Sequence, residues 1–396
     1  MSSVITVPDE VSELLKEIIH THGFSPYSRI DCGPGAEVGE GYNSKTLTVH
    51  VKDENNELHL FLKMQFGMNW HDSFDKMYAN EVHFYTTIYP AYQEFLKEHD
   101  VENGFRNVPR CYGAKKDIVA LENLGPKGYK NNKNAMDEEH IVLGLKTLAK
   151  FHAISFAFKD QKRKLHDTFV EGIQPCAAEI FKKGGFDKII GAYIQNLLDS
   201  LNADEIDELS KRKIDLKQVL IDALFKIDEG RNKYSIITQG DCWSNNVLFS
   251  YDEKHPNIPT NIMLVDWQLV RYGSPAKDLG YFFYPIASES TMENYEHYMK
   301  VYYEELCGQI RQFGSDPEIL YPFDVFKMEW KQFVKYGFVM GFLIIQALLM
   351  EKDEFPNLNE EPNAYDKNAI PKMKNEELFV ARMRGILKHF IKYELL

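Results

Sequence analysis

An aspartate and an asparagine five residues apart lie in a turn between two apolar runs. Asp241 and Asn246 belong to the stretch ITQGDCWSNNVLFSYDE. A turn of this length can direct the carboxylate towards a hydroxyl group while the amide oxygen reaches a metal ion. A lone D-x-x-x-x-N is also typical of an Asx-rich surface turn, so this pair needs support from elsewhere in the chain.

A second aspartate supplies part of that support. Asp266 ends the apolar run IMLVD, twenty residues after Asn246. A buried carboxylate without a partner is costly, and Mg²⁺ is one natural partner, although a turn-capping aspartate fits the same position. Together the two segments favour transfer of a phosphoryl group from ATP to an alcohol, because that reaction needs a carboxylate at the attacking hydroxyl and metal ions on the polyphosphate.

A lysine interrupts an apolar strand pattern earlier in the chain. Lys63 lies in LHLFLKMQF, and strand alternation places it on the face of Phe61, opposite Leu60 and Leu62. An isolated lysine in such a run is often a strand-edge charge. Glu81, in the helix predicted to follow, can pair with it and hold the ammonium group against the α- and β-phosphates. The sequence therefore predicts a Lys63–Glu81 ion pair.

Four glycines precede that strand, in CGPGAEVGEGYNSKTLTV: Gly33, Gly35, Gly39 and Gly41. Glycine lets main-chain N–H groups approach phosphate oxygens without a Cβ in the way. The segment is not a Walker A loop and does not fit G-x-G-x-x-G cleanly, and a loose hairpin also explains it. Its place ahead of the Lys63 strand favours Gly39 and Gly41 as phosphate-binding residues.

The stretch VALENLGPKGY, residues 119–129, passes from a strand into a loop. In a two-lobed kinase this segment is the hinge, where main-chain groups bind adenine. We therefore expect the backbone of Glu122, Asn123 and Leu124 to contact the base. An ordinary linker between domains has the same pattern.

The elements that must position these residues form two unequal parts. The predicted elements are a helix at 9–22, a hairpin of strands 45–53 and 57–66, a helix at 78–99 interrupted near Pro90, two short strands within 108–124, an amphipathic helix at 138–159, three helices within 177–229, a β island at 234–267, and helices from there to the end. The pattern predicts an α+β fold with a β-rich N-lobe (1–122), a hinge (123–128) and a larger helical C-lobe (129–396).

Composition narrows the class of protein. The chain has 396 residues and a formal net charge of −13, which argues against binding to nucleic acid or to anionic membranes. Its five cysteines are scattered, and the N-terminus lacks a signal-peptide pattern, so we expect a cytoplasmic protein. The longest apolar run, 336–350, is too short for a membrane span and predicts a buried helix.

At this point the chain resembles a known family. The segment GDCWSNNVLFSYD…IMLVDWQLVRYGSPAKDLGYFFY is similar to the ecdysteroid kinase-like group, part of the wider superfamily of choline and aminoglycoside kinases with a protein-kinase-like fold. The likeness extends through the glycine-rich segment, LFLKMQF, NEVHFYTTIYP, LENLGPKGY and LKTLAKFHAISF. It implies ATP- and Mg²⁺-dependent phosphorylation of a hydroxyl on a small molecule such as an ecdysteroid or another lipophilic alcohol, including xenobiotics.

The resemblance also implies roles for individual residues. It makes Asp241 the catalytic base, and Asn246 and Asp266 the metal ligands. Lys63 with Glu81 becomes the pair that positions the phosphates. Asp278, in GSPAKDLGYF, resembles the acid that braces the catalytic loop through main-chain hydrogen bonds, a role that is compatible with capping the following helix.

Two positions depart from the family pattern. Gln239 stands where a histidine usually precedes Gly-Asp, and Trp267 stands where phenylalanine is commoner. A glutamine amide can both donate and accept hydrogen bonds, so we expect it to replace the histidine in part, with a larger effect on loop stability than on chemistry. Tryptophan and phenylalanine both have large apolar rings, so we expect Trp267 to change the site little.

Three rival functions stay open from the sequence. A catalytically weak kinase fold that binds a steroid or lipid would explain Gln239, and a choline- or ethanolamine-like kinase would share the same motifs. A protein kinase fits poorly, because the loop lacks the arginine of H-R-D and no A-P-E segment follows. For a lipophilic acceptor, we expect a pocket between the helices of 165–230 and those of 285–350.

Overall fold

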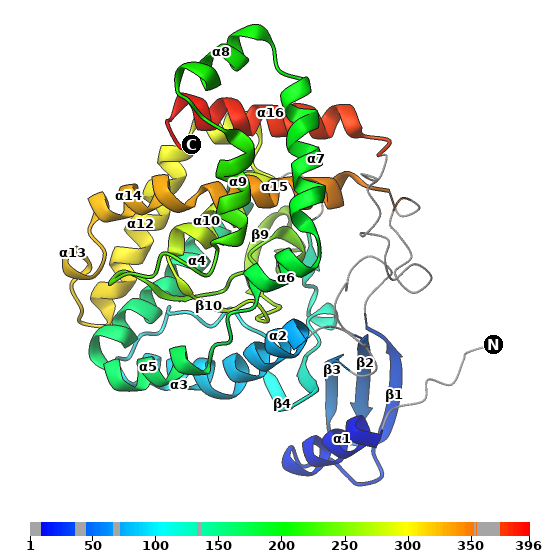
Figure 1. Cartoon of the computed structure of the whole chain (residues 1–396). Helices are drawn as coiled ribbons and strands as arrows, with labels where there is room; N and C mark the ends of the chain where they lie inside the picture. The colour runs from blue at the N-terminus through cyan, green and yellow to red at the C-terminus, as the bar shows by residue number, and fades with distance from the viewer. Residues whose placement is uncertain (1–8, 36–44, 66–71, 133–135, 352–353, 355–372) are drawn as a thin grey trace.

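The computed structural model describes residues 9–35, 45–65, 72–132, 136–351, 354 and 373–396. It has a β-rich N-lobe and a larger helical C-lobe, so the predicted two-lobed α+β architecture is confirmed (Figure 1). In the glycine-rich segment, Gly33 and Gly35 are described, whereas the two predicted phosphate-binding glycines, Gly39 and Gly41, lie outside the described residues.

The N-lobe is an antiparallel sheet of five strands in the order β1-β2-β3-β5-β4. The bounds are α1 (Asp9–Thr21), β1 (Arg29–Pro34), β2 (Lys45–Lys52), β3 (Glu57–Met64), β4 (Cys111–Lys115) and β5 (Ile118–Glu122). Alternation along β3 decides its two faces. Leu60 and Leu62 pack with α1 in a small core, whereas Lys63 lies on the opposite face, as predicted.

The helix that carries Glu81 runs through an irregular turn without a break. It comprises α2 (Asp72–His83), the π-helical turn η1 (Phe84–Ile88) and α3 (Tyr89–Glu98). The interruption predicted near Pro90 is present as this π-helical turn, which ends two residues before the proline and does not end the helix. Pro90 lies in the first turn of α3, directly after the π-helical turn, where the missing N–H of proline is tolerated.

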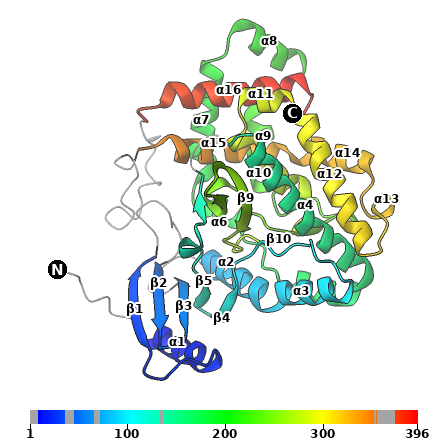
Figure 2. The same cartoon turned by 180° about the vertical axis from the view of Figure 1, so that it is seen from behind.

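The structure has a large hydrophobic core in the C-lobe and a small one in the N-lobe. The large core includes residues that precede the predicted hinge in the sequence. Residues of α2, η1 and α3 belong to the large core of the C-lobe, and Phe84 stacks on Trp267 with ring centroids 3.7 Å apart. Figures 1 and 2 both show α2 and α3 beside the helices of the C-lobe. The segment between β3 and β4 is thus anchored to the lobe that carries the loop of Asp241.

The C-lobe follows the predicted hinge (123–128) and contains most of the helices. Its first elements are η2 (Gly125–Lys127), β6 (Lys130–Asn131), α4 (Glu138–Gln161), α5 (Arg163–Gly172), α6 (Ala177–Lys183), α7 (Phe186–Asp199), α8 (Ala203–Lys211) and α9 (Leu216–Phe225). Where three helices were predicted within 177–229, the structure has the four helices α6 to α9. A capping box formed by Asn202 and Glu205 begins α8.

The β island interrupts the helices and carries the predicted site. It comprises β7 (Ile236–Thr238), η3 (Ser244–Asn246), β8 (Val247–Asp252), β9 (His255–Leu264) and β10 (Arg271–Gly273). The remaining helices are α10 (Pro275–Ile286), α11 (Glu289–Glu293), α12 (Tyr295–Gln312), α13 (Pro317–Leu320), α14 (Phe323–Phe333), α15 (Lys335–Leu349) and α16 (Glu376–Lys392). Helix α15 contains the apolar run 336–350 and is mostly buried, as predicted.

Helix α4 is the central helix of the C-lobe, and its burial differs from the prediction. An amphipathic helix was expected, but residues all round α4 are buried, including Leu145 and Phe151. Helix α4 packs against the strands β7 and β9 and against α12. Among the described residues, α4 is long and apolar enough to cross a membrane, as is a bent pair of α13–α14 with α15. Of the most apolar part of α4, however, 78% is buried inside the protein, as in a core helix.

Candidate active site

The loop after β7 presents Asp241 through a turn that only glycine fits. Gly240 has φ of +87°. A Cβ at this position would lie 1.9 Å from the main-chain oxygen of Leu269, closer than any real contact. The loop then closes into the short helix η3, which ends at Asn246. The glycine before the aspartate is therefore a geometric requirement.

Two side chains hold the carboxylate of Asp241. The hydroxyl of Tyr281 on α10 donates to Oδ1 at 2.9 Å, and Nδ2 of Asn246 donates to Oδ2 at 2.8 Å. The same amide nitrogen also donates to the main-chain oxygen of Asp241 at 3.0 Å. Since both amide hydrogens of Asn246 are committed to Asp241, its carbonyl oxygen is left to accept another ligand.

The surroundings of Asp241 raise the pKa of its carboxyl group above the value it would have in water. Burial of the side chain, with the nearby charge of Asp266, raises the pKa of Asp241 to about 7, while the hydrogen bond from Tyr281 and the charge of Arg271 oppose the rise. A carboxylate with a pKa near neutrality can accept a proton from a hydroxyl more readily than one at its ordinary value. Asp241 is therefore a candidate general base.

Lys63 joins the two lobes at the site. Its Nζ lies 2.7 Å from Oε2 of Glu81 and 2.7 Å from Oδ1 of Asp266, so the predicted ion pair with Glu81 is present. Burial opposes the charge on Lys63, but the two carboxylates raise its pKa overall. Burial also raises the pKa of Glu81, against the effect of Lys63. One ammonium group faces two carboxylates here, and Asp241 adds a third nearby.

Asp266 adopts a backbone conformation that is uncommon for a residue with a side chain. Its φ is +59°, in the left-handed region that aspartate tolerates better than most residues. Gln268 donates to its Oδ2 at 3.3 Å. The main-chain N–H of Val265 bonds to the oxygen of Asn246 at 3.0 Å, so the two predicted metal ligands stand on directly bonded segments.

Asp278 holds the loop of Asp241 through main-chain hydrogen bonds, as the resemblance implied. Its Oδ2 accepts from the main-chain N–H of Gln239 at 2.7 Å, and its Oδ1 from that of Gly240 at 3.0 Å. It does not cap α10, because Ser274 is the N-cap residue and its hydroxyl accepts from Ala276. His152 on α4 approaches Oδ2 at 3.3 Å from the other side.

Gln239 uses both ends of its amide within the loop. Its Nε2 donates to the main-chain oxygens of Val265 and Asp266 at 3.1 and 2.9 Å. Its Oε1 accepts from the main-chain N–H of Asp241 at 2.6 Å and from the thiol of Cys242 at 3.1 Å. The glutamine thus ties the Asp241 loop to the turn that carries Asp266, acting as the donor and acceptor that its chemistry predicts.

The hinge offers a base fewer main-chain donors than expected. The N–H of Glu122 bonds to Arg110 at 2.8 Å, and the N–H of Asn123 bonds to His59 at 2.9 Å. These two donors are already used within the N-lobe. A base would have to bind to the carbonyl groups of Glu122 and Asn123 or to the N–H of Leu124, so the predicted adenine contact is narrower than the sequence implied.

Several residues of the site were missed by sequence reasoning: Tyr281, Arg271, Gln268 and His152. Arg271 donates to the main-chain oxygen of Gly240, and Gln268 contacts both Lys63 and Asp266. Gln268 could have been found from its place two residues after Asp266. The others depend on the packing of α4, α10 and β10 against the loop, which no local pattern in the sequence reveals.

Two cavities lined by described residues lie away from the place where the acceptor pocket was expected. One, of about 330 Å³, lies on the N-lobe sheet beside Asn123. The other, of about 520 Å³, lies at α7, α8 and α9 and includes Leu209 and Leu216. An acceptor pocket between the helices of 165–230 and those of 285–350 stays a prediction.

Known proteins resemble this chain to different extents. A 4-hydroxytryptamine kinase of Psilocybe cyanescens is 41% identical over 56 residues, which are 14% of this chain and 15% of that protein. The corresponding protein of Psilocybe cubensis is 34% identical over 56 residues, 14% of this chain and 16% of that one. The matched segment therefore spans only about a sixth of these curated relatives.

The solved structures that match this chain are distant in sequence. An ethanolamine kinase of Plasmodium vivax has a TM-score of 0.44 and 12% identity, covering 100% of this chain and 93% of that one. A microcompartment-associated aminopropanol kinase has a TM-score of 0.43 and 12% identity, covering 96% and 98%. Residues 38–315, most of the chain and all of the candidate active site, match the profile of one family. The chain belongs to the ecdysteroid kinase-like family.

Proposed function

We propose that this protein is an ATP- and Mg²⁺-dependent phosphotransferase of the cytoplasm that acts on a hydroxyl of a lipophilic small molecule, such as an ecdysteroid or a xenobiotic alcohol. Membership of the ecdysteroid kinase-like family supports the class of reaction. The observation that carries the proposal is the convergence of Lys63, Asp241, Asn246 and Asp266, from distant parts of the sequence, on one buried site.

The residues present fit a magnesium ion. Asn246 and Asp266 offer an amide and a carboxylate oxygen, the hard donors that Mg²⁺ prefers. The site also has more carboxylates than cations, since Glu81 and Asp266 both pair with Lys63, and Asp241 lies close enough to Asp266 and Arg271 to feel the charge of each. A metal ion bound there supplies charge neutralisation on the transferred phosphoryl group.

The residues of the chain supply orientation and proton transfer. Asp241, fixed by Tyr281 and Asn246, would hold the attacking hydroxyl and accept its proton. Lys63, fixed by Glu81, would direct its ammonium group at the phosphates. Gln239 and Asp278 would keep the loop in place through main-chain hydrogen bonds.

The test is a screen of acceptors with labelled ATP and Mg²⁺. The panel contains hydroxylated steroids, sterols, plant phenolics, choline, ethanolamine and 4-hydroxytryptamine, the last named for the curated relatives. We expect phosphorylation of at least one apolar alcohol by the wild type and a loss of about 10²–10⁴-fold in Asp241→Asn. Asp252→Asn, which changes an exposed aspartate at the end of β8, is the control.

Two outcomes would replace the proposal. If choline or ethanolamine is the preferred acceptor, the lipophilic class is wrong while the kinase class stands. If the protein binds a steroid but shows no Asp241-dependent phosphorylation, it is a binding protein with a kinase fold.

A further inference from the structure

Three side chains that can bind a metal ion share one face of the hairpin β2–β3. His50 on β2 is the direct cross-strand partner of His59 on β3. Glu57 precedes His59 by two residues, and alternation places it on the same face. None of the three belongs to the proposed active site. The register of the hairpin alone therefore brings two imidazoles and a carboxylate together.

The side chains are in contact through one carboxylate oxygen. Oε1 of Glu57 lies 2.7 Å from Nε2 of His50 and 3.2 Å from Nε2 of His59. The two imidazole rings are stacked, with centroids 4.3 Å apart and planes inclined by 8°. The three potential ligand atoms all lie within 4.8 Å of one another.

The spacing of these atoms is close to that of a tetrahedral metal site. Bonds of about 2.0–2.2 Å from zinc to imidazole nitrogen and carboxylate oxygen place neighbouring ligands roughly 3.3 Å apart. The two nitrogen–oxygen distances lie on either side of 3 Å. Parallel rings direct their lone pairs along parallel lines, so binding requires one ring to turn about its Cβ–Cγ bond. Both rings have room, because their side chains are 31% and 35% exposed.

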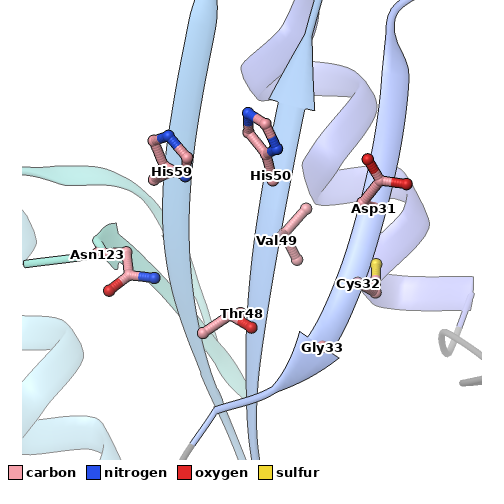
Figure 3. Close-up of a pocket in the computed structure, with 8 residues that line it drawn as sticks. All are labelled: Asp31, Cys32, Gly33, Thr48, Val49, His50, His59 and Asn123. Atoms are coloured by element: carbon pink, nitrogen blue, oxygen red, sulfur yellow. The ribbon is translucent and has the colours of Figure 1, made fainter. Parts of the chain in front are cut away.

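The cluster opens into the cavity of about 330 Å³ on the N-lobe sheet. Figure 3 shows His50 and His59 side by side on neighbouring strands, with Asn123 next to His59 and Thr48 below. His59 alternates with Phe61 and Lys63 on the same face of β3. A metal ion held by the cluster would thus have a fourth position facing this cavity, at the hinge end of the sheet face that carries Lys63.

We propose that His50, Glu57 and His59 form a binding site for a divalent transition-metal ion of the zinc class, with its fourth position open to water or a small ligand. Imidazole nitrogen suits zinc and its neighbours, whereas Mg²⁺ selects oxygen. The site therefore differs in metal preference from Asn246 and Asp266. The ion takes the place of the close contacts between the Glu57 carboxylate and the two rings, and it competes with Lys52, whose Nζ lies 3.6 Å from Oε2 of Glu57.

The test uses the full chain after chelator treatment and dialysis. Calorimetric titration with Zn²⁺ should give one site, and Co²⁺ should give the visible bands of a tetrahedral ion with imidazole ligands. We expect affinity to fall at least tenfold in His50→Ala, in His59→Ala and in Glu57→Gln, and millimolar Mg²⁺ not to compete. Glu57→Gln keeps the shape of the side chain and guards against a folding artefact.

Two controls decide whether the site is the one described. His255→Ala removes an exposed histidine at the start of β9 and should leave the affinity unchanged. Cys32→Ser removes a thiol that lines the same cavity and should also leave it unchanged. Equal Zn²⁺ affinity in the wild type and in a His50→Ala/His59→Ala double variant would overturn the proposal, as would loss of binding in Cys32→Ser alone.

Discussion

Asp241 illustrates how much of the site depends on single hydrogen bonds. Its carboxylate receives one bond from Asn246, five residues away in the same loop, and one from Tyr281, forty residues later on α10. The first bond follows from the local sequence. The second exists because α10 packs directly beneath the loop, and it fixes the direction in which the free lone pairs of the carboxylate point.

Removing the hydroxyl of Tyr281 should therefore affect catalysis more than binding. We expect Tyr281→Phe to lower kcat by about 10–100-fold, because the hydroxyl orients the proposed base, while KM for ATP and for the acceptor changes little. Steady-state kinetics with any acceptor found in the screen measures the split. Tyr284→Phe is the matched control, since its buried hydroxyl lies on the same helix but contacts His389. A parallel fall of kcat in both variants would show that the effect is structural.

Substitutions of Gln239 test whether glutamine, in place of the usual histidine, weakens the loop. In Gln239→Glu the shape is kept, but a carboxylate would face the main-chain oxygens of Val265 and Asp266 in place of an N–H donor. We expect a loss of about 2–3 kcal/mol in the free energy of unfolding and lower activity. Gln239→His should cost less, because one ring nitrogen can donate and the other accept. A large gain of activity in the histidine variant would instead show that glutamine impairs the natural loop.

The sequence predicted the polar residues of the site better than their partners. Lys63, Asp241, Asn246 and Asp266 were found because strand alternation and loop spacing are local properties of the chain, and Glu81 was found as the partner that a phosphate-binding lysine requires. Tyr281 and Arg271 were not, because their contacts depend on how separate elements pack. The hinge shows the same limit, since Asn123 uses its N–H for a bond to β3 that no sequence pattern specifies.

At the scale of elements, two glycines allow α10 and α15 to touch through their backbones. A Cβ on Gly337 would lie 2.2 Å from the main-chain oxygen of Gly280. No side-chain movement can relieve that contact, because the obstacle is the backbone of the neighbouring helix. Helix α10 carries Tyr281 and Asp278, so this close approach also sets the position of the loop above it.

We expect Gly337→Ala to destabilise the protein by about 2–3 kcal/mol, because the added methyl group forces the two helices apart. Chemical unfolding measures the change. Gly308→Ala on α12 is the control. A Cβ there meets nothing within 4 Å, so the better helix propensity of alanine should stabilise the protein by up to about 1 kcal/mol. Similar stabilities of the two variants would contradict the close helix contact.

At the scale of the whole molecule, the ion pairs of Lys63 connect the sheet of the N-lobe to the turn after β9 in the C-lobe. Helix α2 carries Glu81 and packs with the core of the C-lobe. The contact between Lys63 in the N-lobe and Asp266 in the C-lobe was predictable, because the proposed chemistry requires both residues at one site. The shared core was not, because the sequence places residues 72–98 before the hinge while their apolar side chains pack beyond it.

A nucleotide bound at this junction should stabilise both lobes together, and the effect should require the metal. With ATP at a hundredfold excess over its Kd, binding adds about 2.7 kcal/mol to the free energy of unfolding, a rise of a few degrees in Tm. We expect this rise with ATP and Mg²⁺ and most of it to vanish with ATP and a chelator, because Lys63 alone would then have to offset the negative charge of the phosphates and of Glu81, Asp241 and Asp266. Asp266→Asn should lose the Mg²⁺-dependent part of the shift, whereas Asp252→Asn should keep it. Thermal unfolding monitored by fluorescence gives the comparison, and an equal shift with and without Mg²⁺ in the wild type would rule out a metal-dependent nucleotide site.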